Sequence, residues 1–468
     1  MKKVERDEAL RAEIGRGFSA LGSWTAGMAG KPLPAAARRR AALILADDIG
    51  AMVVATREPA VKAAQADMLK SSGAAEASVF AAGAPRGDRY STAAANGMAA
   101  TWCELDEGFR NAPCHAGAYV IPALLAEAEA GDLTVGQTLT ALALSYEIAA
   151  RCALAFPFSA MSVHPHAAFA TIGAAAASAV ARGVDERTLI AAVTGAASMT
   201  FAGPYEHAID GVLVRNAWTS AGAWIGMRSV DWAARGIGGI PETLYDVFVS
   251  ALGTGAVPEA LTDDLGGAWA VGGGYHKIFA CCQYAHGAIE ASLDLHTRLA
   301  EKGMDSTAIA EIVVETHPRG LTLTTTEPET DLAAKFSMPH AAAASAVLGT
   351  GGQAAFSNDT LEDSRIADLR RRVKLVPHSN VQPWPNDRPS RVVWRMRDGD
   401  EWSAERMNAR GGADQPFDEP TLLAKLNENS AAEFPGLPRG LWDIVEGATP
   451  DEAPWRAVLA KSLGGAKG

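Results

Sequence analysis

The sequence contains no uninterrupted apolar run of about 20 residues, the length that a membrane-spanning helix requires. The nearest approach is Ala167–Ala181, which consists mostly of alanine and glycine and is too short and too weakly apolar to cross a bilayer. The N-terminal residues MKKVERDEALRAE are charged and lack the apolar core of a secretory signal. We therefore expect a cytoplasmic protein without a membrane partner.

Cysteine and positive charge are also scarce. The five cysteines are an odd number and form no Cys-x-x-Cys pair, so neither a disulfide framework nor a zinc site is expected. Lysine and arginine number 42 against 54 aspartates and glutamates, which gives a net charge of −12. This balance excludes a nucleic-acid partner bound through bulk positive charge. A small anionic ligand stays possible, because one local basic pocket is enough to bind it.

The common cofactor signatures are missing as well. The sequence has no Walker A motif and no Gly-x-Ser-x-Gly elbow. The glycines at Gly236, Gly238 and Gly239 precede Pro241 and follow no strand, so they do not form a dinucleotide-binding turn. Histidines, carboxylates and scattered basic residues remain as the candidates for chemistry.

The pattern of the first half is helical. Apolar residues recur at helical spacing over 36–54, 139–153 and 167–181, and the high alanine content favours helices that pack closely. Asp185 and Glu186 fit the start of a further helix. No alternation of strands and helices precedes residue 265, so a doubly wound sheet is not expected.

The pattern changes at the glycine cluster 266–274, which suits a loop or hinge. After it, strands are predicted at 309–316, 373–377 and 391–397, with helical stretches at 283–301 and 332–348 and a helix that restarts at 419–426. The fold class is therefore mainly α with a smaller α+β domain. We predict an all-helical domain over 1–265 plus 415–468, interrupted by an α+β domain over 266–414.

The strongest local constellation is Glu104-Leu105-Asp106-Glu107 followed by His115. Three carboxylates within four positions repel one another unless they are solvated or used, and a nearby histidine makes an acid/base pair possible. A solvated helix end is the structural alternative.

A second constellation is His164-Pro165-His166, ahead of an alanine-rich helix. Two histidines at this spacing can bind a metal on a strand, but Pro165 blocks strand pairing and favours a helix entry. Acid/base work, anion binding and a purely structural role stay open. Three weaker segments follow: Tyr275-His276-Lys277, Lys335 to His340, and Asp210 to Asn216 with Arg215.

Taken together, these segments resemble the MmgE/PrpD family, which includes 2-methylcitrate dehydratase, cis-aconitate decarboxylase and iminodisuccinate epimerase. The resemblance covers most of the chain and lies in blocks of fixed order: ILADDIGAMV, AAANGMAATWCELDEG, HPHAAFATIGAAAAS, YHKIFACCQYAHGAIEA, AAKFSMPHAAAA and FDEPTLLAKL. It implies a large helical domain, a smaller α+β lid, a cleft between them as the active site, a homodimer, and no metal or organic cofactor.

The resemblance also implies roles for individual residues. His164 would be the principal general base or acid and His115 its partner across the cleft, oriented by Glu104 or Asp106. Lys277 and Arg215 would anchor the carboxylates of a small di- or tricarboxylic acid. The candidates in the neighbouring segments are Lys335 and His276 for substrate binding and His340 as a lid-borne proton donor.

The chain departs from the family pattern at two positions. Gly211 stands where decarboxylase-like members carry a lysine, and His340 stands where they carry a tyrosine. The resemblance implies proton transfer next to a carboxylate, which we interpret first as the reaction of a 2-methylcitrate dehydratase-like hydro-lyase. The alternatives are a cis-aconitate decarboxylase-like carboxy-lyase, an iminodisuccinate-type epimerase, a metal hydrolase using His164 and His166, and a non-catalytic family member.

Overall fold

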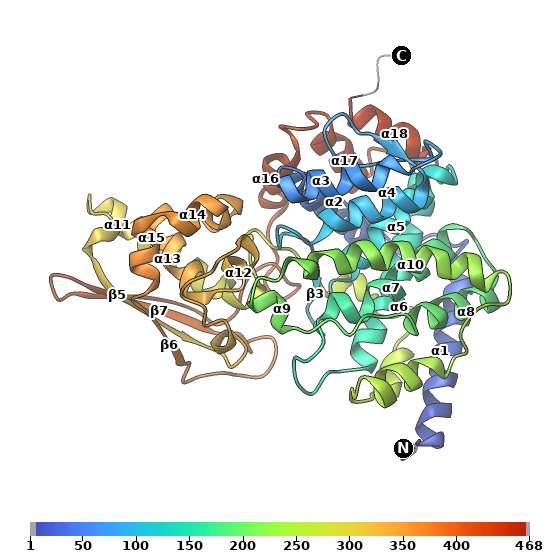
Figure 1. The fold of residues 1–468 in the computed structure, drawn as a ribbon, viewed down its shortest axis with the longest axis horizontal. Helices are drawn as coiled ribbons and strands as arrows, with labels where there is room; N and C mark the ends of the chain where they lie inside the picture. Colours follow the sequence, from blue (N-terminus) through green and yellow to red (C-terminus); the bar gives the residue numbers. More distant parts are fainter. Residues whose placement is uncertain (1–5, 465–468) are drawn as a thin grey trace.

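The structure of the protein is a computed structural model that describes residues 6–464. Its elements form two groups (Figure 1). The helical part consists of helices from both ends of the chain. Their bounds are α1 Glu8–Met28, α2 Ala35–Ala55, α3 Pro59–Lys70, α4 Arg89–Ala100, α5 Ala116–Ala130, α6 Val135–Ala155, α7 Pro165–Ala181, α8 Glu186–Ala197, α9 Glu206–Ile209, α10 Ala217–Ala233, α16 Glu419–Ser430, α17 Leu437–Glu446 and α18 Trp455–Ser462.

Helix α7 is the centre of the helical part and packs against α5, α6, α8 and α10. Small residues permit the close approach. A Cβ atom on Gly222 or Gly226 of α10 would lie 2.6 Å from the Cβ atom of Ala170 or Ala174 of α7. The alanine and glycine content of the first half therefore serves tight helix packing, as the composition predicts.

The α+β part is built on one four-stranded sheet with the order β6-β5-β7-β8. Strand β5 pairs in parallel with β6 and antiparallel with β7, and β7 and β8 form a hairpin. Helices α11, α13 and α15 pack against this sheet. The bounds are α11 His286–Glu301, β5 Ile309–Thr316, α12 Asp331–Lys335, α13 Met338–Leu348, α14 Asn358–Glu362, α15 Ser364–Arg370, β6 Val373–Pro377, β7 Ser390–Met396 and β8 Glu401–Arg406.

The predicted fold class is confirmed at the coarse level, as a mainly helical chain with a small mixed sheet. The expectation of a purely helical first part is wrong, because two short strand pairs lie within or against it. Strand β1 (Ala77–Ser78) pairs with β2 (Arg86–Gly87), and β3 (Gly108–Phe109) pairs with β4 (Gly274–Tyr275). The predicted domain boundaries stay a prediction.

The C-terminal helices return to the first part of the chain. Helices α16 and α17 pack on α2, and Lys425 of α16 forms an ion pair with Asp47 of α2. All five cysteines are free and buried. Within residues 6–464, no helix is long and apolar enough to cross a membrane.

Candidate functional site

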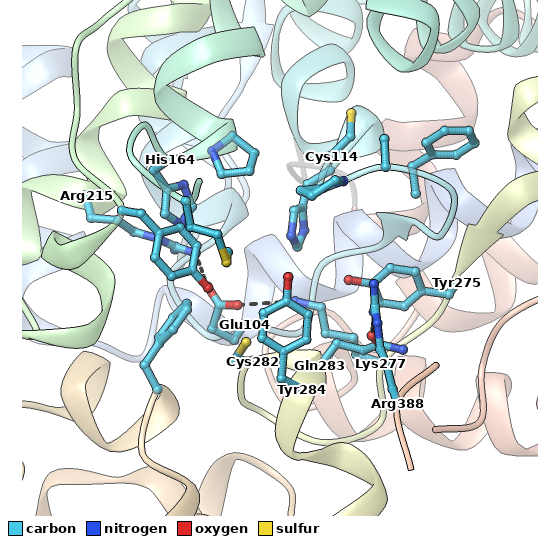
Figure 2. Close-up of a pocket in the computed structure, with 18 residues that line it drawn as sticks. Glu104, Cys114, His164, Arg215, Tyr275, Lys277, Cys282, Gln283, Tyr284 and Arg388 are labelled. Atoms are coloured by element: carbon cyan, nitrogen blue, oxygen red, sulfur yellow. Dashed lines mark hydrogen bonds and ion pairs between the residues drawn. The ribbon is translucent and has the colours of Figure 1, made fainter. Parts of the chain in front are cut away.

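A cavity of about 60 Å³ lies where the two parts of the chain meet, and 18 residues line it. His115, His164 and Arg215 come from the helical part, and Phe336 and Arg388 come from the segments around the sheet. Figure 2 shows His164 and Arg215 on one side, Lys277 and Arg388 on the other, and Glu104 between them. Five residues predicted to act together, from four separate segments of the sequence, therefore line the same cavity: Glu104, His115, His164, Arg215 and Lys277.

The two histidines of the cavity occupy equivalent places on adjacent helices. His115 is the N-cap residue of α5, and His164 is the N-cap residue of α7. Because α5 and α7 pack side by side, their N-termini bring both rings to the same end of the helix pair. Pro165, which follows His164, is the first residue of α7, and its fixed φ suits that position.

His164 is buried and is held neutral by its surroundings. Its Nδ1 atom lies 3.1 Å from the backbone N–H of His166, and its Nε2 atom lies 3.4 Å from Nε of Arg215. Both ring nitrogens thus face N–H donors, although a neutral imidazole has a single lone pair and accepts from only one of them. Burial, followed by the charge of Arg215, holds the pKa of His164 well below its ordinary value. A neutral imidazole at neutral pH is equipped to accept a proton.

His115 is oriented by a carboxylate. Its Nδ1 atom lies 2.7 Å from Oδ2 of Asp106 and 3.1 Å from the carbonyl oxygen of Glu107. Because both neighbours are acceptors, Nδ1 carries the ring proton and donates it, which fixes the tautomer. The second nitrogen, Nε2, is the one left for exchange with a ligand in the cavity.

The short strand pair β3–β4 explains how the acidic segment meets Lys277. Gly108 lies opposite Tyr275 in an antiparallel register, and continuing this register by two residues places Asp106 opposite Lys277. The Nζ atom of Lys277 is 3.5 Å from Oδ1 of Asp106 and 3.3 Å from Oε2 of Glu104. Burial would lower the pKa of Lys277, but the two carboxylates raise it above its ordinary value.

Glu104 is the buried carboxylate that joins two of the three cations that line the cavity. Its side chain forms ion pairs with Arg215 and with Lys277 (Figure 2). Burial would raise the pKa of Glu104, but Arg215 and Lys277 outweigh it and lower the pKa. The residue has a φ of 53°, in the left-handed region that a side chain occupies only at a cost of about 1–2 kcal/mol. Glu104 thus combines a costly backbone conformation with two buried ion pairs, and such conformations cluster at functional sites.

Two further acids lie behind the cavity. Asp48 accepts the backbone N–H of Glu107 at 2.7 Å, and Glu107 accepts the Tyr146 hydroxyl at 2.6 Å. Burial raises the pKa of Glu107 to about 8, and burial together with Glu107 raises the pKa of Asp48 well above its ordinary value. At neutral pH at least one proton therefore resides on this pair. The solvated helix end proposed as the alternative for this segment is wrong, because Glu104, Asp106 and Glu107 are all buried.

His276 is a predicted binding residue that the structure does not bring to the cavity. It lies between Tyr275 and Lys277, which both line the cavity. Successive side chains of an extended segment point to opposite sides, so His276 points away. Its Nδ1 atom lies 2.8 Å from Oδ2 of Asp47. This contact ties the hinge segment to α2.

Lys335 and His340 are also outside the cavity. Lys335 is buried and donates to Asp331 at 2.7 Å and to the carbonyl oxygen of Trp102 at 3.1 Å, while the next residue, Phe336, lines the cavity instead. His340 lies in the first turn of α13, with Nε2 2.9 Å from the carbonyl oxygen of Ala355 and Nδ1 3.0 Å from Arg370. The expectation of a proton donor at His340 is therefore replaced by a structural role inside the α+β part.

Gly211 has no room for a side chain. Its φ is +71°, and a Cβ atom there would lie 2.2 Å from Oγ1 of Thr330 and 2.7 Å from the Cβ atom of Ala333. Thr330 also donates a hydrogen bond to the Gly211 carbonyl at 3.1 Å. A lysine at this position is incompatible with the way α12 approaches, so Arg215 is the cation that reaches the cavity from this segment.

The cavity also contains residues that the sequence alone did not identify. Arg388 is buried, lies 3.6 Å from Asp387 and stacks over the ring of Tyr284 at 5.1 Å. Tyr205 stacks on His164 with ring centroids 5.3 Å apart. Both residues lie in loops or short turns without periodicity, so no sequence signal marks them. Tyr275 lies in the segment Tyr275-His276-Lys277 that the sequence pattern marks, although no role was predicted for it.

The metal site considered for His164 and His166 does not form in the structure. The Nδ1 atom of His166 lies 2.9 Å from the Tyr119 hydroxyl, and the ring packs edge-on against both His115 and His164. Over residues 6–464, no group of three histidine, cysteine, aspartate or glutamate side chains is arranged to hold a metal ion. The ring of His166 instead packs between the two histidines that line the cavity, His115 and His164.

The fold and the cavity define a mainly helical protein with an α+β part and a buried, charged site at their junction. Comparison with family models gives the family. The model described as the MmgE/PrpD N-terminal domain matches residues 19–252, and the model described as the MmgE/PrpD C-terminal domain matches residues 279–438. The chain therefore belongs to the MmgE/PrpD family, as its motifs predict. A search of curated proteins finds no match.

Proposed function

We propose that the protein is a cofactor-independent lyase that moves a proton at a carbon next to a carboxylate of a small di- or tricarboxylic acid. The observation that carries this proposal is that His164 and His115 line the same small cavity as Arg215 and Lys277. A carbon next to a carboxylate is a weak acid. Its deprotonation requires a base, together with positive charge that stabilises the developing enediolate.

The two histidines have different roles in this proposal. His164 is neutral because its pKa is depressed by burial and by Arg215. It accepts the proton from carbon once a substrate carboxylate draws Arg215 away, since loss of that neighbouring charge raises its pKa. His115, held by Asp106 through Nδ1, offers Nε2 for proton delivery to a leaving hydroxyl. Two proton-transfer groups in one cavity fit an elimination, so we propose a 2-methylcitrate dehydratase-like hydro-lyase. Each positioned group contributes about 10²–10⁴-fold to the rate.

The cations would bind the substrate by exchanging partners. In the structure Arg215 and Lys277 are both paired with Glu104. A substrate carboxylate competes for these cations and draws the Arg215 guanidinium away from Nε2 of His164. The proposal requires the single lone pair of the neutral ring to lie on this Nε2 atom. Substrate binding would thereby prepare the base.

Decarboxylation is less favoured for a geometrical reason. Decarboxylase-like members carry a lysine at the position of Gly211, which has no space for a side chain here. An epimerase needs two proton-transfer groups as an elimination does, so the histidines do not separate these two reactions.

Product analysis tests the proposal. The purified protein is incubated with 2-methylcitrate, cis-aconitate and iminodisuccinate, and products are followed by proton NMR and CO₂ detection. An unsaturated product from 2-methylcitrate supports the hydro-lyase. Removal of the proton at the methyl-bearing carbon turns the methyl doublet into a singlet, whereas removal at the methylene carbon gives a vinylic proton. CO₂ release, or loss of optical activity without loss of mass, would assign the carboxy-lyase or the epimerase. Ligand-induced stabilisation without any conversion would support a non-catalytic member.

We also propose that the protein is a homodimer, as the family resemblance implies. Supporting this, apolar side chains that are 39–50% exposed lie together in sequence at Val212, Leu213 and Val214, just ahead of α10, and Trp224 of α10 is 41% exposed. Light scattering should return twice the chain mass of 48.7 kDa. A mass of one chain at micromolar concentration would contradict the dimer.

A further inference from the structure

The cavity lined by Arg215, Lys277 and Arg388 is called the charged cavity below. A second cavity of about 220 Å³ adjoins it. Residues from α6, from the segment after it and from α7 form its walls, with Leu154, Phe156, Phe158, Val163 and Phe169 among them. Of the residues that line it, those with polar side-chain groups are Asn111, Tyr205 and Arg319. No carboxylate and no histidine line it. We call it the apolar cavity.

The two cavities are neighbours that share walls. Five residues line both of them: Ala112, Pro113, Met161, Pro165 and Tyr205. Tyr205 is one of these shared residues, and its ring stacks on the ring of His164, the proposed base. The methionine is flexible and adapts its shape to what lies beside it. A molecule whose reacting carbon lies at His164 would therefore have the apolar cavity next to that carbon.

The two cavities suit different parts of one molecule. The charged cavity has a volume of about 60 Å³ and contains Arg215, Lys277 and Arg388, so it fits carboxylate groups. A carboxylate in the apolar cavity would find one cation, Arg319, and would otherwise lose its hydration against apolar walls, which is costly. A hydrocarbon group gains free energy there by leaving water. A dry cavity of about 150 Å³ is enough to hold a benzene ring, so a methyl group would leave most of this one empty.

We propose that the substrate carries a hydrocarbon substituent larger than methyl, of the size of a butyl or benzyl group, and that this substituent occupies the apolar cavity. This inference rests on the proposed function, because it assumes that the carboxylates lie in the charged cavity. It narrows the substrate class from small polycarboxylates to alkyl- or aryl-substituted ones.

Binding of a homologous series tests the inference. The probes are succinate and its 2-methyl, 2-butyl and 2-benzyl derivatives, and their Kd values are measured by calorimetry with the full chain. Each added methylene group that enters the apolar cavity should tighten binding about fourfold, up to the butyl derivative. A Kd that stays flat or rises along the series would overturn the inference.

A cavity-filling variant and a matched control locate the effect. Leu154→Trp places a large side chain at the wall of the apolar cavity, and Leu33→Trp makes the same change at another partly buried leucine outside both cavities. Leu154→Trp should abolish the gain for the butyl and benzyl derivatives and leave succinate binding unchanged, whereas Leu33→Trp should retain the gain. Circular dichroism checks that both variants fold.

The possible failures are distinguishable. If Leu154→Trp weakens succinate as much as the larger probes, the apolar cavity is an access route and the inference is wrong. If succinate binds with no trend along the series, the inference fails while the proposed function stands. If none of the four dicarboxylates binds, the inference is overturned, and the product analysis with 2-methylcitrate decides the proposed function separately.

Discussion

Nζ of Lys277 lies 3.5 Å from Oδ1 of Asp106, two residues beyond the point where Gly108 of β3 pairs with Tyr275 of β4. Two strands of two residues each thus join the acidic segment of the helical part to the lysine that follows the glycine cluster. Asp106 also holds Nδ1 of His115 at 2.7 Å. One carboxylate therefore connects the lysine proposed to bind substrate with a histidine proposed to transfer a proton.

Replacing Lys277 should damage both stability and binding. Lys277→Met leaves Glu104 and Asp106 buried with one cation fewer, which should lower the free energy of unfolding by about 3–5 kcal/mol. Loss of a charged contact to substrate should also reduce kcat/KM by about 10–100-fold. Denaturant unfolding and steady-state kinetics, carried out well below the unfolding transition, measure the two effects.

Lys335→Met is the matched control for this prediction. Lys335 is as deeply buried as Lys277 and is paired with Asp331, but it does not line the cavity. The Lys335→Met variant should lose stability by a similar amount and keep the KM of the wild type. A KM that rises equally in both variants would mean that Lys335, too, contacts the substrate.

The buried acid at Glu107 should make stability depend on pH in an unusual direction. Because burial raises its pKa to about 8 in the folded state, the native protein retains a proton between about pH 5 and pH 8 that the unfolded chain releases. Stability contributed by this group therefore falls as pH rises through that window, by up to about 1.4 kcal/mol per pH unit. Glu107→Gln mimics the protonated acid and should gain stability relative to the wild type as pH rises.

Denaturant unfolding at several pH values between 5 and 8 measures this difference. Glu428→Gln, the same change at an exposed position, should follow the wild-type pH dependence. If the wild type and Glu107→Gln have parallel pH profiles, Glu107 is ionised in the folded protein and the account of the acid pair is incorrect.

Gly211 should not tolerate even an alanine. Gly183 also has a positive φ, of +61°, but an added Cβ atom there would meet no atom within 4 Å. Gly183→Ala should therefore cost about 1–2 kcal/mol for the backbone conformation alone. Gly211→Ala should cost about 1–3 kcal/mol more, because its Cβ atom collides with Thr330 and Ala333 of the α12 region. Equal shifts in Tm for the two variants would show that α12 moves to accommodate the added Cβ atom at little cost in stability.

Local patterns predicted the regular elements well, for identifiable reasons. The β-branched run Ile309–Thr316 forms β5 with the predicted bounds, and Asp185 caps α8 as its position indicates. The stretch 332–348, predicted as one helical region, is two helices, because Ser337 caps α13 with Pro339 in its first turn. Capping residues inside an alanine-rich stretch thus outweigh helix propensity.

The sequence predicted only those residues of the site that lie in a motif of the family. The segments with His115, His164 and Lys277 do meet in one cavity, as the family resemblance implies. The sequence could not exclude His276, because its direction depends on the two-residue strand β4, which has no periodicity to detect. It could not identify Arg388, which lies 111 positions after Lys277 and enters the cavity through tertiary folding alone.

The most direct test of the account is deuterium incorporation next to a carboxylate, followed by proton NMR in D₂O. The comparison is between the wild type and His164→Asn. Asparagine retains an N-cap acceptor for α7, so the variant should fold, while it removes the proposed base. His296→Asn, at a partly buried histidine of α11 outside the cavity, is the control.

The account predicts that the wild type and His296→Asn exchange the proton of one of the tested polycarboxylates, with 2-methylcitrate and 2-butylsuccinate included. His164→Asn should exchange it about 10²–10⁴-fold more slowly, with unfolding close to that of the wild type. Exchange at the wild-type rate in a folded His164→Asn protein would contradict the central claim that His164 takes the proton.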